Sequence, residues 1–230
     1  MFSNFDFDVI VRSLPYLFYE GMTFTVLLTV LATAGGIVLG TLLALMRLSG
    51  IAVLTLPAAA YVNLMRSVPF VLMIFWFYFL VPYIGQWITF SAQPLQVGAF
   101  VSCLVTFTMF EAAYFCEIMR AGIQSIPRGQ VAAAQALGMG YPTTMAYIVL
   151  PQAFRNMVPV LLTQTIILFQ DTSLVYVISV TDFLGAASKV AQRDGRLVEM
   201  YLFAACVYFV ISLLASRAVQ RLQRRIAIIR

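Results

Sequence analysis

The sequence predicts an all-α integral membrane protein with about five transmembrane helices. Its 230 residues are 62% hydrophobic and only 10% charged, and the mean hydropathy is +0.95. A water-soluble domain carries roughly 25% charged residues, so this composition is typical of a membrane protein. Uncharged segments longer than the ~20 residues that a helix needs to cross a bilayer support the same fold class. We therefore treat residues 1–230 as a single transmembrane domain.

The first span is predicted over residues 21–46, which lie between Glu20 and Arg47 and contain no charged side chain. We do not expect a signal peptide here, because the residues before the segment are acidic and the apolar run is too long.

The second and third spans are predicted over 54–82 and 95–116. A stretch with proline, glycine and glutamine lies between them and is typical of a turn. Within the second span, Ser67-Val68-Pro69 marks a break or kink, because a proline disfavours helical geometry in the residue before it. The depth of Arg66, just before this break, stays open.

The fourth and fifth spans are predicted over 153–170 and 198–216. Five spans place the two termini on opposite sides of the membrane, and the loops richer in Arg and Lys are expected inside. The basic residues favour an outer N-terminus and an inner C-terminus. The inner side then holds Arg47, Arg120, Arg128, Arg155, Arg217, Arg221, Arg224, Arg225 and Arg230, and the outer side holds Arg12, Lys189, Arg193 and Arg196. This anchoring explains the basic tail, so we expect no nucleic-acid partner.

The side-chain inventory excludes several kinds of catalytic site. The chain has no histidine, so it has neither a Ser-His-Asp triad nor a histidine metal ligand. Its three cysteines, Cys103, Cys116 and Cys206, are isolated in apolar runs and are expected to be small buried hydrophobes. The only lysine, Lys189, precedes Val190, so no Walker A loop is present. We expect no catalytic residues, no metal and no cofactor bound by this chain, and ATP would be handled by a separate subunit.

A short helix is predicted over residues 127–139, in the long inner loop between the third and fourth spans. Pro127 suits a first helical turn, alanines favour the helix, and Gly138 ends it. The small side chains let another surface approach the helix backbone closely. By itself this pattern fits an ordinary loop helix as well as a docking helix.

The spacing around this helix resembles the EAA loop of ABC-importer permeases. Ala132-Ala133-Ala134 is followed by Gly138 after three residues and by Ile148-Val149-Leu150-Pro151 after nine more. The chain departs from the family at Ala132, where a glutamate is usual, so a charged contact at that position is absent or supplied by a neighbour. The residues that the resemblance assigns to ATPase coupling are Gly129, Gln130, Ala132, Ala133, Ala134, Leu137, Gly138, Ile148, Leu150 and Pro151.

Further segments resemble the polar-amino-acid subfamily of these permeases. They are Arg66-Ser-Val-Pro69 and the stretch from Glu117 to Gln130. The segments 109–114 and 169–177 are similar to the glutamate/aspartate branch. That likeness implies import of glutamate or aspartate; glutamine or a basic amino acid is the alternative, because the Arg66 motif also resembles carriers of other amino acids.

The resemblance also implies partners and a location. Such permeases lie in the bacterial inner membrane, surrounded by lipid, and pair with an identical or a homologous permease subunit. Each coupling helix sits in a groove of a cytoplasmic ATP-binding subunit, and a periplasmic binding protein delivers the substrate. Closure of the ATPases would then switch the access of the site from outside to inside.

Polar residues at membrane depth are the candidates for the substrate path, because ionisable groups there usually face a bundle interior or an aqueous path. They are Arg66, Glu111, Tyr114, Asp171, Thr172 and Ser173. For Glu111 a role in the path and a role in interhelix pairing both stay open, and Asp171 is either a path residue or a helix cap. Glu117 lies three residues before Arg120, in helical pairing range, which favours a structural role.

Two other functional classes fit the sequence less well. A stand-alone secondary transporter has no use for an ATPase-docking helix, and we find no internal inverted repeat in the sequence. An integral membrane enzyme lacks a supporting nucleophile–base pair or metal cluster.

Overall fold

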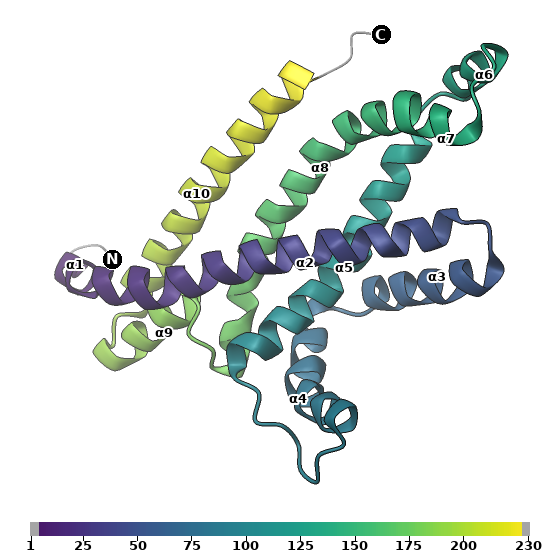
Figure 1. Cartoon of the computed structure of the whole chain (residues 1–230). Coiled ribbons are helices and arrows are strands. Elements are labelled where there is room, and N and C mark those ends of the chain that lie inside the picture. Colours follow the sequence, from purple (N-terminus) through teal and green to yellow (C-terminus); the bar gives the residue numbers. More distant parts are fainter. Residues whose placement is uncertain (1–4, 227–230) are drawn as a thin grey trace.

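A computed structural model describes residues 5–226 of the chain, and the predicted all-α membrane fold is confirmed (Figure 1). Arg230 of the basic tail lies outside the described residues. Within residues 5–226 there is no strand. Five helical segments are long and apolar enough to cross a membrane. They are Phe7–Leu48, Phe70–Thr89, Ala99–Gln124, Tyr141–Ile178 and Leu197–Ile226.

The first segment is longer than the predicted 21–46. It runs through α1 (Phe7–Tyr16), a π-helical turn η1 (Leu17–Met22) and α2 (Thr23–Leu48). Gly21 lies in the π-helical turn, where an added Cβ would come within 2.9 Å of the Phe183 Cα. Only glycine therefore lets another part of the backbone approach this closely.

Helix α2 packs against α5 (Ala99–Gln124), and small residues allow their close approach. Ala32, Gly36, Gly40 and Ala44 recur every four residues of α2, and all four are buried. Residues four apart share one face of a helix, and small side chains on that face let two membrane helices approach closely. An added Cβ at Gly40 would lie 2.8 Å from the Cβ of Phe115. The pair α2–α5 thus forms the centre of the bundle, and α5 is the most enclosed of the five spans.

The predicted second span, 54–82, is two helices. They are α3 (Ala52–Ser67) and α4 (Phe70–Thr89), and Val68 between them is extended, with φ −107° and ψ 136°. This break lies where Pro69 was expected to cause one. The turn expected after residue 82 begins later, because α4 continues past Pro82 and ends only at Thr89; Phe90, which follows the helix, has φ 53°.

The coupling-loop region forms α6 (Arg128–Ala136), shorter than the predicted 127–139, and a long bent helix. That helix runs through α7 (Tyr141–Thr144), a π-helical turn η2 (Met145–Val149), α8 (Leu150–Asp171) and a 3₁₀ turn η3 (Thr172–Ile178). Pro151 has no backbone N–H to donate, and wider π turns can accommodate such an interruption. The fourth span therefore begins before the predicted residue 153.

Two more helices complete the chain: α9 (Phe183–Asp194), which was not predicted, and α10 (Leu197–Ile226). α10 contains the predicted fifth span, 198–216. Cys103 and Cys116 are buried as expected. The expectation was wrong for Cys206, which is exposed, because it lies on a face of α10 turned away from the bundle.

The two ends of the bundle differ, and we name them after their short helices. At the α6 end lie α6, the C-terminal ends of α2 and α5, and the C-terminal end of α10; at the α9 end lie α1 and α9 (Figure 1).

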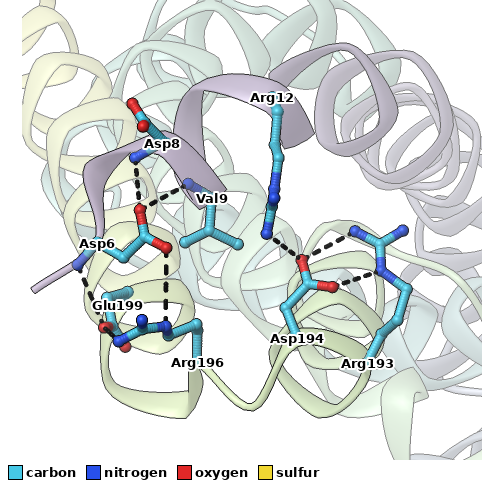
Figure 2. Close-up of polar contacts among 8 residues, drawn as sticks. All are labelled: Asp6, Asp8, Val9, Arg12, Arg193, Asp194, Arg196 and Glu199. Atoms are coloured by element: carbon cyan, nitrogen blue, oxygen red, sulfur yellow. Dashed lines mark hydrogen bonds and ion pairs between the residues drawn. The ribbon is translucent and has the colours of Figure 1, made fainter.

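At the α9 end, ion pairs connect α1 to the last residues of α9 and to the turn that follows it (Figure 2). Asp6 caps α1 by accepting hydrogen bonds from the backbone amides of Asp8 and Val9, and its carboxylate lies 3.7 Å from Arg196 Nε. Farther along α1, Arg12 Nη2 lies 3.1 Å from Asp194 Oδ2, and Arg193 also pairs with that carboxylate. The hydrogen bond from Arg193 holds the pKa of Asp194 below its usual value.

A second acid at this end has the opposite pKa shift. Asp182, outside the five spans, caps α9 by accepting hydrogen bonds from the amides of Leu184 and Gly185 at 3.0 and 2.8 Å. Its side chain is fully buried, and this burial raises its pKa from 3.8 to about 6. The native state therefore holds this proton more tightly than the unfolded state does.

We expect the free energy of unfolding to fall, through Asp182, as the pH rises from about 4 to about 6, because the folded protein must give up a proton that the unfolded chain has already lost. The measurement is detergent-phase thermal unfolding of the wild type and of Asp182→Asn from pH 4 to pH 7. The difference in unfolding free energy between the wild type and Asp182→Asn should change between about pH 4 and about pH 6. Asp194→Asn is the control. The pKa of Asp194 is lower in the folded protein than in the unfolded chain, so above pH ~4 this carboxyl group is ionised in both states, and the difference between Asp194→Asn and the wild type should not change with pH there. If the difference between the wild type and Asp182→Asn does not change with pH, the raised pKa of Asp182 is contradicted.

Candidate functional site

A cavity of about 430 Å³ lies where the α3–α4 break meets α5 and α8. The break opens the wall, because Val68 and Pro69 leave helical geometry there. The lining residues combine one cation, one acid and several aromatic and amide groups. They are Arg66, Ser67, Val68, Pro69, Phe70, Phe110, Tyr114, Gln164, Ile167 and Asp171.

Arg66 is the only basic residue among those that line this cavity. It occupies the last turn of α3, and its side chain is 44% exposed. The guanidinium carbon lies 5.6 Å from the centroid of the Tyr114 ring, a cation–π contact that places the charge beside the cavity. Arg66 Nη1 also lies 3.8 Å from Glu117 Oε1. Arg66 therefore lies at the cavity wall.

Asp171, at the C-terminal end of α8, supplies the acid. It precedes the 3₁₀ turn η3 without capping it through its side chain, so the capping interpretation finds no support in the geometry. Within residues 5–226 its carboxylate makes neither a hydrogen bond nor an ion pair with another side chain, which leaves it available to a ligand.

Three other sequence candidates lie outside the cavity lining. Glu111 is fully buried, and Gln164 Nε2 donates to its two carboxylate oxygens at 3.1 and 3.3 Å. Glu111 thus pairs α5 with α8 behind the cavity wall. Thr172 is buried and donates to the carbonyl of Phe169 at 2.7 Å, and Ser173 is not among the lining residues.

Sequence reasoning did not single out Gln164, although this residue connects the cavity to the buried carboxylate. Its signal was present in the sequence: Gln164 lies seven residues before Asp171, a spacing that returns to the same face after two helical turns. The aromatic walls Phe70 and Phe110, with ring centroids 4.0 Å apart, were missed as well.

Three arginines surround the carboxylate of Glu117, toward the α6 end of the bundle. The pair predicted with Arg120 is present, with Arg120 Nη2 2.6 Å from Glu117 Oε2. Arg47, from the end of α2, donates to the other oxygen, and Arg66 lies near that same oxygen. One carboxylate therefore joins α2, α3 and α5.

Helix α6 projects from the α6 end, away from the spans (Figure 1). It ends in a Schellman motif, in which the amides of Gly138 and Met139 donate to the carbonyls of Gln135 and Ala134 at 2.9 and 3.1 Å. Gly138 adopts φ +77°, a conformation that favours glycine.

Most of α6 is uncovered. Ala134 is its only buried residue, and the Leu137 side chain that follows the helix is 83% exposed. The exposed members of the predicted coupling set are Gly129, Gln130, Ala132, Ala133, Leu137, Gly138, Leu150 and Pro151; Ile148 is partly buried. The motif is thus divided: its first part lies on α6, and Ile148, Leu150 and Pro151 lie on η2 and α8.

Between residues 5 and 226, no group of three or more His, Cys, Asp or Glu side chains could hold a metal ion.

Comparisons with known proteins agree on one family. Residues 36–228 match the family described as "Binding-protein-dependent transport system inner membrane component". The chain is 55% identical over 224 residues to the glutamate/aspartate import permease protein GltK of Escherichia coli O6:H1, covering 97% of this chain and 99% of that protein. It is 32% identical over 226 residues to the glutamine transport system permease protein GlnP of Escherichia coli K12, covering 98% and 100% of the two chains.

Solved structures agree with this fold. A crystal structure of an amino acid ABC transporter with histidines contains a chain that is 32% identical, with a TM-score of 0.84 over 96% of this chain and 98% of that one. The MetNI methionine ABC transporter, at 20% identity and a TM-score of 0.72, shares the fold.

Proposed function

The chain belongs to the family of binding-protein-dependent transport system inner membrane components, and on that premise we propose that it forms the substrate path of an ATP-driven importer of glutamate and aspartate. As a family member it is a multi-pass transport subunit of the inner membrane. The observation that carries the proposal is the cavity in which Arg66 and Asp171 lie together.

The cavity offers one charge of each sign to an acidic amino acid. Asp171 can pair with its ammonium group, and Arg66 can pair with its side-chain carboxylate, a group that glutamine lacks. A guanidinium presents several N–H donors in a plane, which suits a carboxylate. Phe70, Phe110 and Tyr114 supply the apolar walls that small-molecule sites use to exclude water.

The substrate class follows from the relatives as much as from the cavity. The 55% identical relative is named for glutamate and aspartate, and the 32% identical relative for glutamine. Arg66 is a cation suited to a substrate with an additional carboxylate, so acidic amino acids are our first candidate and glutamine is the competitor.

Energy for transport would come from a cytoplasmic ATP-binding subunit that receives α6. An exposed helix of small residues, followed by the uncovered Leu137, fits a groove on a partner. A second permease subunit, identical or homologous, and a periplasmic binding protein complete the proposed assembly. No cofactor is assigned to this chain, and a stand-alone secondary transporter is disfavoured by its membership of a binding-protein-dependent family.

In this arrangement the α6 end faces the cytoplasm and the α9 end faces outward. Arg47, Arg120, Arg128 and Arg155 all belong to the α6 end, as does the basic C-terminal part of α10. Their number is what the positive-inside rule expects of a cytoplasmic surface. The N-terminus would then lie outside.

The test is Arg66→Gln in the importer reconstituted with its ATPase and binding protein. We expect ATP-driven uptake of glutamate and aspartate to fall at least about tenfold, because a charged hydrogen bond to the substrate is worth ~1.5–3 kcal/mol. The control is Arg155→Gln, which removes the same charge from an exposed position on α8 outside the cavity and should leave uptake near the wild-type rate. Unchanged glutamate uptake by a correctly assembled Arg66→Gln importer would refute the proposed path. If the wild type imports glutamine efficiently but neither glutamate nor aspartate, glutamine becomes the proposed substrate.

A further inference from the structure

We propose that Glu117 is a positioning residue that acts through Arg66: it competes with the carboxylate of an acidic ligand for the same guanidinium, and so limits how tightly the cavity holds that ligand. This inference rests on the proposed function. It assigns a transport role to a carboxylate that lies outside the lining of the cavity.

The contacts of Glu117 are unequal. Arg47 donates a hydrogen bond to Oε1, and Arg120 donates two to Oε2, at 2.6 and 3.2 Å. Arg66 is the third cation, and its Nη1 stands 3.8 Å from Oε1, within ion-pair range but beyond hydrogen-bond range. Arg47 and Arg120 therefore anchor the carboxylate, while Arg66 is attracted to it without being bound by it.

Arg66 also differs from the other two in its surroundings. Its side chain is 44% exposed, compared with 16% for Arg47 and 30% for Arg120, and it is the only one of the three that lines the cavity. The Tyr114 ring supports the guanidinium from within the same helix as Glu117. Because of that ring, loss of the Glu117 charge should not displace Arg66 from the cavity wall.

The charges favour competition. Three guanidinium groups surround one carboxylate, so the cluster carries an excess of positive charge that a ligand carboxylate can use. Glu117 reduces the potential that such a ligand meets, since an opposite charge near a cation partly neutralises its field. When Glu117 is neutral, Arg66 should attract an acidic ligand more strongly and release it more slowly.

The position of Glu117 also suits a role in release. It lies on α5, and Arg120 Nη1 bonds Gln124 Oε1 at 2.7 Å one turn farther on, close to the point where the chain enters α6. The carboxylate that faces Arg66 is therefore linked, through Arg47 and Arg120, to the ends of α2 and α5 next to the coupling loop.

The test is the dissociation constant of glutamate, and separately of glutamine, measured with radiolabelled ligand on the purified importer complex in nanodiscs without binding protein. For Glu117→Gln we expect the glutamate dissociation constant to be about two- to fivefold lower, the range typical of a partly exposed ion pair, and the glutamine constant to be nearly unchanged. Turnover of glutamate should fall in the same variant, because release is slower.

Three further variants separate this role from a structural one. In an Arg66→Gln background, Glu117→Gln should have no effect on glutamate binding, because the residue through which it acts is gone. Asp8→Asn removes an equal charge from an exposed position at the α9 end and should change neither constant. If Glu117→Gln prevents assembly, Glu117→Asp carries the test: it keeps the charge but shortens the side chain, and a smaller decrease in the glutamate constant is expected.

Any of three results would overturn the inference. The dissociation constants of glutamate and glutamine could shift equally, neither Glu117 variant could shift the glutamate constant, or the effect of Glu117→Gln could persist in the Arg66→Gln background. The outcome is distinct from that for the proposed function. If Arg66→Gln weakens glutamate binding while the Glu117 variants bind like the wild type, the path stands and the role of Glu117 falls.

Discussion

Replacing Leu137 by aspartate is expected to abolish ATP-driven uptake while the permease remains folded. Leu137 follows α6, and its side chain is 83% exposed, so it contributes little to the packing of this chain. An exposed leucine beside a helix of small residues is a suitable apolar anchor for a partner groove, and loss of one central anchor commonly costs ~2 kcal/mol or more of binding. The aspartate would also place an unpaired charge in that groove.

The measurement is co-purification of the ATP-binding subunit with the variant, together with ATP-driven uptake in proteoliposomes. We expect at least about a tenfold loss of both, with an unchanged detergent-phase unfolding midpoint. Phe90→Asp is the matched control. Phe90 is 94% exposed, follows α4 on the opposite side of the bundle, and has φ 53°, which aspartate tolerates. Leu137→Asp importers that retain their ATPase and transport normally would refute the docking role of α6.

The fold class and its family were predictable because their signals are local. Apolar segments long enough to span a bilayer appear directly in the sequence, and the five spans and the family membership are confirmed. The Val68 break was predictable for the same reason, since Pro69 constrains its immediate neighbour. Helix α9 was missed because its 12 residues are too few and too polar for a membrane span, although its apolar residues recur with helical spacing.

The site was only partly predictable because it joins residues from distant helices. Arg66, Tyr114 and Asp171 were selected one by one for being polar at membrane depth, and the structure brings all three to one cavity. The same criterion also selected Glu111, which is buried, accepts hydrogen bonds from Gln164 and does not line the cavity. No spacing in a sequence shows which of two buried polar residues faces the ligand, because that depends on how α5 and α8 are rotated against each other.

Replacing Gly40 by valine is expected to prevent assembly of the membrane domain. A Cβ at Gly40 would lie 2.8 Å from the Cβ of Phe115, 3.0 Å from the carbonyl oxygen of Ala112 and 3.0 Å from the amide nitrogen of Cys116. Two of these atoms belong to the α5 backbone, which cannot move aside as the end of a flexible side chain can. Valine adds two methyl groups beyond that Cβ, so α2 and α5 would have to separate.

Separation of this pair should affect the whole domain, because α5 is the most enclosed span and Ala32, Gly36 and Ala44 continue the same contact along α2. We expect Gly40→Val to lower the free energy of unfolding by about 3 kcal/mol or more, at the upper end of the effects of overpacking, with Gly40→Ala intermediate. The measurement is thermal unfolding and size-exclusion chromatography in detergent. Gly129→Val is the control: Gly129 lies inside α6, an added Cβ there meets nothing within 4 Å, and valine is no worse than glycine in a helix, so its effect should stay within about 0.5 kcal/mol. Equal stability of the Gly40 and Gly129 variants would mean that the close contact between α2 and α5 does not hold the bundle together.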